Sequence, residues 1–261
     1  MSKRIESRAE AIMRMILRAG AISVQGLVEQ IGSSATNIRR DLARLERRGL
    51  LIRTRGGAIL PALLPFKPFH HDPAAQVDQL LFIEQKRRIG LAASELIGES
   101  ETIGLAAGTT TAQIGRALRH RYRISVITNA LNIAMELSHQ SAIKTTLTSG
   151  VLAEGPTFAL VAESAVSFLK DVYLDKAFIG VAGLDIERGA TMLDSDEALV
   201  ARTMIQQSSQ VIVVADSSKI DRVSRICLCP CSAVDVLVTD TGISEASCEA
   251  FRAKGIKVIC A

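Results

Sequence analysis

The stretch Gly32-Ser33-Ser34-Ala35-Thr36-Asn37-Ile38-Arg39-Arg40-Asp41-Leu42 decides the fold of the first 60 residues. Gly32 and Ser33 supply a tight turn, and Ser34 can cap a helix that runs to about Arg48. The apolar residues of that helix recur at helical spacing and face a core, whereas its other faces carry Asn37, Arg39, Arg40, Arg44, Arg47 and Arg48. An arginine-rich helix behind a tight turn is typical of the DNA-reading helix of a helix-turn-helix.

Two more helical patterns precede this stretch. The first has the apolar positions Ile5, Ala9, Ile12, Met13, Ile16 and Leu17, and the second has Val24, Leu27, Val28 and Ile31. Gly20 is expected to end the first helix, Ser23 to cap the second, and Gly49 to end the third. The order and the short connections predict a compact three-helix unit.

A wing is predicted after the third helix. The segment Leu50-Leu51-Ile52-Arg53-Thr54-Arg55 and the segment Ala58-Ile59-Leu60 flank Gly56-Gly57, so two short strands around a Gly-Gly turn are expected. Arg53 or Arg55 would then reach the DNA backbone or the minor groove. Residues 1–60 are therefore predicted to form a winged helix-turn-helix domain. The alternative is a small helical subdomain with a solvated arginine face.

The charge of the chain is divided unevenly. Residues 1–60 hold 12 Lys and Arg against 5 Asp and Glu, and residues 61–261 hold 19 against 22. Only the first block is therefore expected to contact a polyanion. Arg can pair with guanine and Asn with adenine, and further basic groups neutralise phosphates. The candidate DNA contacts are Asn37, Arg39, Arg40, Arg44, Arg53 and Arg55.

Composition restricts the class of protein further. The chain is 48% apolar and 22% charged, which is typical of globular domains. No apolar run is long enough to cross a bilayer, and the N-terminus lacks the apolar core of a signal peptide. Five cysteines without a secretory signal favour free thiols in the cytoplasm. We expect no membrane association.

A second domain is predicted behind a linker. Residues 61–80 contain four prolines, so they are expected to form a semi-rigid spacer. Residues 81–261 alternate between helical and strand patterns, which predicts a mainly parallel sheet covered on both faces. The expected strands are 102–105, 124–128, 145–148, 177–181, 211–215, 234–239 and 256–259.

Polar clusters follow several of these strands. Ligands of such sheets bind at the carboxyl ends of the strands, where backbone amides and hydroxyls can hold an anion. The candidate ligand-binding residues are Gly108, Thr109, Thr110, Thr111, Thr128, Asn129, Gly183, Asp185 and Lys219. Each cluster taken alone can also be an ordinary helix cap or a solvated side chain.

The two halves together resemble the DeoR family of regulators. The first match is the stretch from Ser34 to Leu42, followed by Leu45-Glu46, Gly49-Leu50 and Arg53-Thr54-Arg55-Gly56-Gly57-Ala58. The second comprises Ala107-Gly108-Thr109-Thr110, Thr128-Asn129-Ala130-Leu131, Phe178-Ile179-Gly180, Gly183-Leu184-Asp185 and Ala215-Asp216-Ser217-Ser218-Lys219. The resemblance implies DNA contacts from Ser34, Arg39 and Arg40. It also implies a sensor domain like ribose-5-phosphate isomerase, which binds a phosphorylated sugar on residues 108–111.

The chain departs from the family pattern at four positions. The family usually has Thr at Asn37 and His at Arg55, which affects the operator that is read. It commonly has acidic residues at Ala106 and Ala182, and alanine can neither hydrogen-bond a sugar hydroxyl nor act as a base. The identity of the effector is therefore not transferable from the family.

Two other classes of function stay open at this point. An active sugar-phosphate isomerase would need a carboxylate base, for which Asp185 with Lys219 is the available pair. Alternatively, the second domain could serve oligomerisation only. We favour a non-enzymatic repressor without a cofactor, released from DNA by its effector. Because two-fold operators match two-fold proteins, it is expected to be a homo-oligomer.

A cysteine cluster offers a further hypothesis. Cys227, Cys229 and Cys231 alternate, so on an extended segment they would project to one side. Three thiolates could hold a metal, but the spacing is not the usual zinc pattern. An incidental structural role is favoured, and no metal site is predicted.

Overall fold

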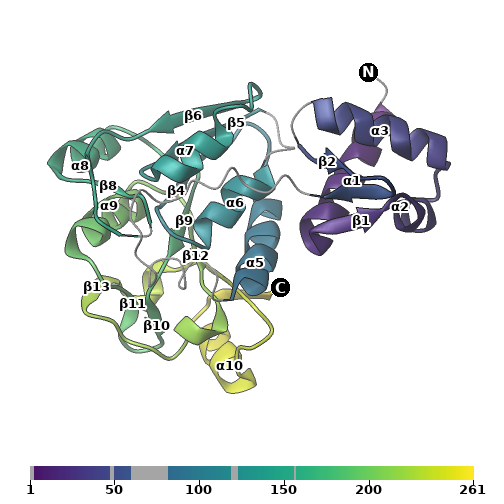
Figure 1. Ribbon diagram of the computed structural model, residues 1–261. Coiled ribbons are helices and arrows are strands. Elements are labelled where there is room, and N and C mark those ends of the chain that lie inside the picture. Colours follow the sequence, from purple (N-terminus) through teal and green to yellow (C-terminus); the bar gives the residue numbers. More distant parts are fainter. Residues whose placement is uncertain (1–2, 48–49, 60–81, 119–122, 156) are drawn as a thin grey trace. The chain divides into compact units, whose positions relative to one another are not determined.

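The computed structural model describes residues 3–47, 50–59, 82–118, 123–155 and 157–261 (Figure 1). The chain divides into two compact units, Met1–His70 and His71–Ala261. Each unit has its own hydrophobic core. The predicted linker at 61–80 and the predicted helix end at Gly49 lie outside the described residues.

The first unit contains the three predicted helices. Their bounds are α1, Lys3–Ala19; α2, Val24–Ile31; and α3, Ala35–Arg47. Ser23 caps α2 because its Oγ accepts a hydrogen bond from the Gly26 amide at 3.0 Å. Gly20 and Gly32 follow α1 and α2 with φ of 71° and 69°, a left-handed backbone that favours glycine. The core of this unit joins all three helices to the wing: Ile12, Met13, Ile16, Leu27, Ile38, Leu42, Leu45, Leu50, Leu51 and Ala58.

The wing is a three-stranded sheet. Strands β2, Ile52–Arg53, and β3, Gly57–Ile59, form the predicted hairpin, and β1, Ala21–Ser23, pairs with the other side of β3. Gly57 belongs to β3, so the turn itself is formed by residues 54–56. A Cβ on Gly57 would lie 2.1 Å from the Ile22 carbonyl oxygen. Glycine at position 57 therefore permits the close pairing of β1 and β3.

A seven-stranded parallel sheet forms the centre of the second unit. Its spatial order is β15-β14-β12-β9-β4-β5-β6. The strand bounds are β4, Thr102–Leu105; β5, Ile124–Thr128; β6, Ile143–Leu147; β9, Lys176–Gly180; β12, Val211–Val214; β14, Val236–Thr239; and β15, Lys257–Cys260. The predicted parallel α/β architecture is confirmed.

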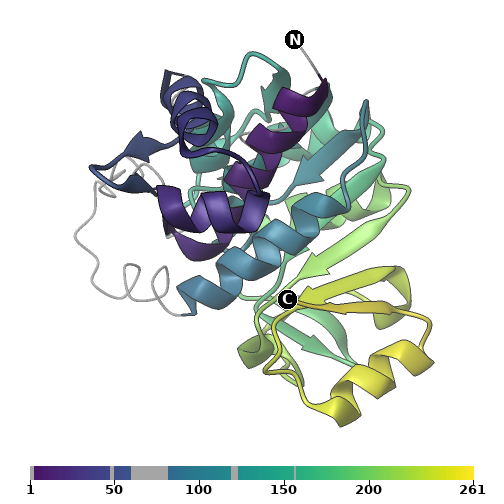
Figure 2. The same cartoon turned by 90° about the vertical axis from the view of Figure 1, so that its right-hand side faces the viewer.

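Helices lie on the faces of this sheet (Figure 1). Their bounds are α5, Ile83–Glu95; α6, Thr111–Ala117; α7, Leu131–Leu137; α8, Glu163–Lys170; α9, Ser195–Gln206; and α10, Glu245–Ala253. Two short 3₁₀ turns are η2, Ser217–Lys219, and η3, Cys231–Ala233. Helix α10 packs beside β15, and both are yellow in Figure 2. None of the helices in the described ranges is long and apolar enough to cross a membrane.

Two small sheets were not predicted. One has the order β10-β11-β13, with β10 at Gly183–Asp185, β11 at Gly189–Met192 and β13 at Ile226–Cys229. The other pairs β7, Val151–Leu152, with β8, Leu160–Val161. Strand β10 begins three residues after β9 ends, so the small sheet continues directly from the centre of the large one.

The chain reverses its direction across the large sheet between β9 and β4. From β4 the chain continues to β5 and β6 on one side of the sheet. From β9 it continues to β12, β14 and β15 on the other side. In parallel sheets with this reversal, the loops that follow the two central strands diverge, and ligands bind between them. The relevant loops here are residues 106–110, after β4, and 181–182, after β9.

Candidate nucleic-acid interface and effector site

Helix α3 presents an exposed basic face. Arg39 and Arg40 are exposed, and Asn37 is half-buried. The helix begins after Ser34, whose Oγ accepts a hydrogen bond from the Asn37 amide at 3.3 Å. The buried face of α3 holds Ile38, Leu42 and Leu45, which fixes the direction of the opposite face. The predicted division between core residues and exposed arginines is observed for Arg39 and Arg40.

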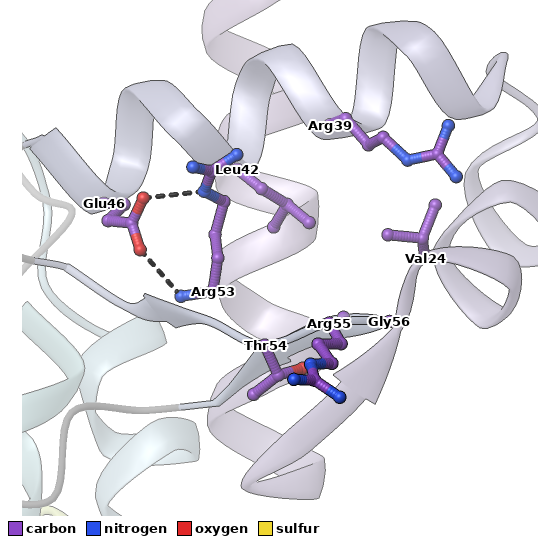
Figure 3. A pocket seen from close by; sticks show the side chains of 9 residues that line it. Val24, Arg39, Leu42, Glu46, Arg53, Thr54, Arg55 and Gly56 are labelled. Carbon is purple, nitrogen blue, oxygen red and sulfur yellow. Dashed lines mark hydrogen bonds and ion pairs between the residues drawn. The ribbon is translucent and has the colours of Figure 1, made fainter.

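A hollow of about 440 Å³ separates α3 from the wing (Figure 3). Arg39 comes from the helix, whereas Thr54, Arg55 and Gly56 come from the wing turn. Val24 and Leu42 supply apolar surface to the same hollow. Basic side chains from two elements thus line one concave surface, where they are able to neutralise phosphates.

Glu46 connects the helix to the wing across this hollow. Its carboxylate accepts a hydrogen bond from the Arg53 backbone amide at 3.0 Å and from the Arg53 Nε at 2.6 Å (Figure 3). These hydrogen bonds, the backbone one first, hold the pKa of Glu46 below its usual value. Arg53 was predicted to contact DNA, and its guanidinium is paired with Glu46; both Arg53 and Arg55 are exposed.

A buried carboxylate holds α3 against α1. Asp41 is only 2% exposed, and its Oδ2 accepts a hydrogen bond from Arg8 Nε at 2.5 Å. Arg44 lies on the same side, with Nη1 3.9 Å from Asp41 Oδ1. That Nη1 atom is buried and has no hydrogen-bond partner among the described residues. Arg44, predicted to contact DNA, is therefore turned partly inward. Sequence reasoning also missed Asp41, because a charged residue is expected on the solvent face.

In the second unit, the loop after β4 carries the Gly-Thr-Thr-Thr cluster. Thr111 Oγ1 donates a hydrogen bond to the Gly108 carbonyl at 3.0 Å, which closes the loop on itself. Thr110 is 7% exposed, and its hydroxyl makes no hydrogen bond within the described part of the chain. Thr109 is half-buried. Thr110 thus offers a free hydroxyl at this edge of the sheet.

Thr128 and Asn129 hold this loop in place. Thr128 Oγ1 donates to the Leu105 carbonyl at 2.7 Å and accepts from the Ala130 amide at 3.1 Å. Asn129 Oδ1 accepts from the Ala107 amide at 2.9 Å, and its Nδ2 donates to the Leu160 carbonyl at 3.1 Å. Both side chains were predicted as ligand contacts. Their polar atoms are committed to backbone groups, which makes them supports of the loop.

The remaining predicted residues belong to the edge formed by β10 and η2. Asp185 Oδ1 accepts hydrogen bonds from the amides of Glu187 and Arg188, at 3.0 and 2.8 Å, within the turn between β10 and β11. Gly183 is buried, and a Cβ there would lie 2.4 Å from the Arg222 carbonyl oxygen. Lys219 ends η2 and is half-buried. Asp185 thus stabilises a turn, and Lys219 lies on a neighbouring segment, since Leu184 and Ile220 form a parallel bridge.

Two family models match the chain, one in each unit. The model of a DeoR-like helix-turn-helix domain matches residues 8–62, and the model of the DeoR C terminal sensor domain matches residues 82–241. The chain belongs to the DeoR family. The predicted family resemblance is confirmed.

Individual DeoR-type relatives match over nearly the whole chain. The HTH-type transcriptional repressor GlcR of Bacillus subtilis is 32% identical and covers 97% of this chain and 95% of its own. The glycerol-3-phosphate regulon repressor of Escherichia coli is 30% identical, covering 89% and 90%. Among solved structures, ribose 5 phosphate isomerase A from Neisseria gonorrhoeae is 19% identical, covers 54% of each chain and has a TM-score of 0.37.

Ala106 and Ala182 lie in the loops at the reversal of the sheet. Ala106 is 2% exposed, and its amide donates to the Phe178 carbonyl at 3.1 Å. Ala182 is half-buried, and its amide donates to the Thr191 carbonyl at 2.9 Å. Both positions follow the two central strands, β4 and β9. Their side chains add no hydrogen-bonding group to this edge.

The cysteine cluster differs from the predicted arrangement. Cys227 is exposed and Cys229 is buried, the pairing of β13 with β11 shifts register between these two residues, and Cys231 lies in η3. The segment is extended only as far as Cys229, so the three cysteines do not share one strand. Burial, followed by the neighbouring thiols, raises the pKa of Cys229 to about 11. No group of three His, Cys, Asp or Glu residues in the described ranges is placed to hold a metal ion.

Proposed function

We propose that this chain is a transcriptional repressor of a carbohydrate operon that leaves its operator when a phosphorylated sugar or related metabolite binds. The observation that carries this proposal is the pairing of two surfaces on one chain. One is an exposed arginine face on α3 beside a wing, and the other is a loop with a free threonine hydroxyl at the reversal of a parallel sheet. The named relatives are transcriptional repressors, which supports the same conclusion.

On the DNA side, the residues divide into contacts and supports. Arg39 and Arg40 read base edges in the major groove, with Asn37 beside them, and Arg55 of the wing neutralises a backbone phosphate. Ser34 contributes through the start of α3. Arg44 and Arg53 act mainly as supports. Arg44 pairs with Asp41 and Arg53 pairs with Glu46, and these pairs help to hold α3 and the wing in position.

On the effector side, the phosphate binds to the loop 108–111. Gly108 leaves room for an anion, and the hydroxyls of Thr109 and Thr110 donate to it. Thr111, Thr128 and Asn129 keep this loop closed and attached to β5. Gly183 and Lys219 form the opposite side of the binding edge.

The protein acts as a homo-oligomer in the cytoplasm and without enzymatic activity. A two-fold assembly would present two recognition helices to one operator. Against an isomerase, Asp185 Oδ1 is engaged by two backbone amides in the turn after β10. A general base needs a carboxylate that reaches the substrate. Turnover of pentose or hexose phosphates that Asp185→Asn abolishes would contradict the non-enzymatic assignment.

The DNA-reading surface is tested with DNA from upstream of the protein's own gene. Arg39→Ala and Arg40→Ala should each weaken specific binding by about 1–3 kcal/mol, whereas Arg252→Ala on α10 should not change it. Effector binding should be the same in all three variants. Unchanged DNA affinity in both α3 variants would overturn the assignment of α3.

The effector surface is tested with Thr110→Ala. This variant should bind DNA as wild type does without effector, but it should need a higher concentration of phosphorylated ligand for release. Thr203→Ala, a buried threonine of α9 whose hydroxyl donates to the Leu199 carbonyl, serves as the control for removing a threonine hydroxyl elsewhere. A response of Thr110→Ala equal to that of wild type would overturn the phosphate site.

A further inference from the structure

Two thiols meet where the last helix of the chain packs beside the last strand (Figure 2). Cys248 belongs to the buried face of α10, together with Ser247 and Phe251. Cys260 ends β15, the strand at one edge of the large sheet, and it is exposed. The Cys260 thiol shares a hydrogen bond with the Cys248 thiol. A buried thiol is therefore in contact with a thiol that solvent reaches, and both are free.

Both cysteines are anchored by the backbone around them. Cys260 pairs with Thr239 of the parallel strand β14, and the Ala261 amide donates to the Thr239 carbonyl at 2.9 Å. The Cys248 amide donates to the Ser244 carbonyl at 3.0 Å at the start of α10. Because both elements are anchored, each thiol is held at a high effective concentration for the other. The pair is therefore arranged to close on itself in preference to joining two outside thiols.

The surroundings of Cys260 keep its thiol protonated at neutral pH. Partial burial, followed by the neighbouring Cys248, raises the pKa of Cys260, and the carboxylate of Asp240 adds to the rise. The guanidinium of Arg252 opposes it. Because the thiolate is the attacking species, Cys260 reacts slowly at neutral pH and faster as the pH rises. This chemistry favours slow thiol–disulfide exchange.

Helix α10 connects the cysteine pair to the segment that follows η2. Ser247 precedes Cys248, and its Oγ donates to Asp221 Oδ2 at 2.5 Å. The Asp221 amide in turn donates to the Leu184 carbonyl of β10 at 2.8 Å. A restriction on α10 therefore reaches Asp221 through one hydrogen bond and β10 through a second.

Strand β14 makes a second connection to η2. Asp240 directly follows Thr239, the residue that pairs with Cys260. Asp240 is 3% exposed, and its Oδ2 accepts a hydrogen bond from the Ser217 amide at 2.7 Å, at the start of η2. Its Oδ1 accepts from the Gly242 amide at 2.8 Å. The cysteine pair and η2 are thus joined from the helix and from the strand.

We propose that Cys248 and Cys260 form a redox-active dithiol, which a low-molecular-weight disulfide such as oxidised glutathione converts to an intramolecular disulfide. The Cys260 thiolate attacks one sulfur of the oxidant, and the first glutathione leaves as its thiolate. The Cys248 thiolate then attacks the Cys260 sulfur and displaces the second glutathione. The two electrons lost by the cysteines reduce the oxidant to two thiols, which take up the two protons. The disulfide restricts α10 against β15 and, through Ser247, the segment at Asp221.

Mass spectrometry of the glutathione-treated protein tests this exchange. The full chain is equilibrated with oxidised and reduced glutathione at mildly alkaline pH, its remaining thiols are alkylated, and it is digested. Wild type should give a cross-link between Cys248 and Cys260, and reduced glutathione should reverse it. Cys227→Ser, which removes the exposed thiol of β13, should give the same cross-link. Stable glutathione on Cys260, or a cross-link from either cysteine to Cys227, would overturn the proposal.

Serine variants separate the roles of the two thiols. Cys248→Ser removes the second thiol, so glutathione should remain on Cys260. Cys260→Ser removes the exposed thiol, and the buried Cys248 should then stay free of glutathione. Serine differs from cysteine by one atom, and circular dichroism checks that both variants fold. Loss of glutathione from Cys260 in Cys248→Ser, at the rate seen in wild type, would show that Cys248 does not act on Cys260.

Hydrogen exchange in the oxidised and reduced chains tests the connection to η2. The Asp221 amide should exchange more slowly in the oxidised chain, because the disulfide limits the opening of α10. The Ala107 amide, bound to Asn129 Oδ1 after β4, is the control and should exchange at the same rate in both chains. Equal exchange of the Asp221 amide in a fully cross-linked chain would contradict the restriction of this segment.

Discussion

The carboxylate of Glu46 receives two hydrogen bonds from Arg53, one from its backbone amide at 3.0 Å and one from its side-chain Nε at 2.6 Å. Glu46 is on α3 and Arg53 is on strand β2 of the wing. One acidic residue therefore fixes both the position of the wing backbone and the direction of a wing arginine. The exposed Arg55, two residues further on, depends on this attachment.

Removal of the Glu46–Arg53 attachment should weaken DNA binding. We expect Glu46→Gln to reduce operator affinity by about threefold, the scale of an exposed ion pair, even though it removes a negative charge near DNA. The effects of Glu46→Gln and Arg53→Gln should be non-additive in the double variant, as measured by fluorescence anisotropy. Tighter DNA binding by Glu46→Gln would mean that Arg53 contacts phosphate and that Glu46 only competes with it.

The two wing arginines should differ in the salt dependence of DNA binding. Arg55→Ala removes a free cation, so the slope of log K against log salt should fall by about 0.9 if it neutralises one phosphate. Arg53→Ala removes a cation that Glu46 already neutralises, and this slope should change much less. Equal changes for the two variants would contradict the division into contact and support.

The Arg8–Asp41 pair should matter for the stability of the first unit. Asp41→Ala leaves Arg8 without its partner, and we expect a loss of about 2–3 kcal/mol, because one member of a largely buried pair is removed. Replacing both with Arg8→Met and Asp41→Leu should recover most of that loss. Calorimetric unfolding of the full chain measures the effect, and Glu29→Ala, an exposed acid on α2, is the control. A change no larger than that control would refute the structural role of Asp41.

Asn129 should affect effector binding through the loop that it supports. Asn129→Ala removes the acceptor of the Ala107 amide and the donor to Leu160, and about 2 kcal/mol of stability should be lost with them. Effector affinity should fall, and DNA affinity without effector should stay unchanged. Asn129→Asp keeps the acceptor and should retain more effector affinity than Asn129→Ala. Equal losses of effector affinity in both variants would show that the hydrogen bond to the Ala107 amide does not determine effector binding.

The thiols of β13 should react with iodoacetamide in a defined order. Cys227 is exposed and should be alkylated in the native protein, whereas Cys229 is buried and its pKa is raised to about 11. Because the thiolate is the nucleophile, Cys229 should stay unmodified at neutral pH and begin to react only as the pH approaches 11. Mass spectrometry of the digested protein distinguishes the two. Rapid modification of Cys229 at pH 7.5 would contradict its burial.

The sequence was most informative where a pattern is local. The spacing of Ile38, Leu42 and Leu45 predicted the buried face of α3, and Ser23 and Gly32 marked the limits of α2. The alternation of strands and helices predicted the parallel sheet, since each unit of that pattern lies within about 30 residues. The exposed positions of Arg39 and Arg40 followed directly from the buried face.

Tertiary contacts account for most of what was missed. The partners Arg8 and Asp41 are 33 residues apart, so no local pattern identifies their ion pair. Strand β1 has three residues and owes its existence to pairing with β3. The same holds for β10, β11 and β13, which are three or four residues long. Asn129 was predicted as a ligand contact, and its hydrogen bonds with Ala107 and Leu160 could not be predicted because they depend on how two loops meet.

The most direct test of the account is operator binding measured against increasing concentrations of phosphorylated ligands, for wild type and Thr110→Ala in parallel. We predict specific binding to the upstream DNA, released by one class of phosphorylated compound, with release by Thr110→Ala shifted to higher concentrations. By linkage, operator DNA should weaken ligand binding by the same factor. Specific DNA binding that no phosphorylated compound alters would contradict the claim that the second unit senses such a metabolite.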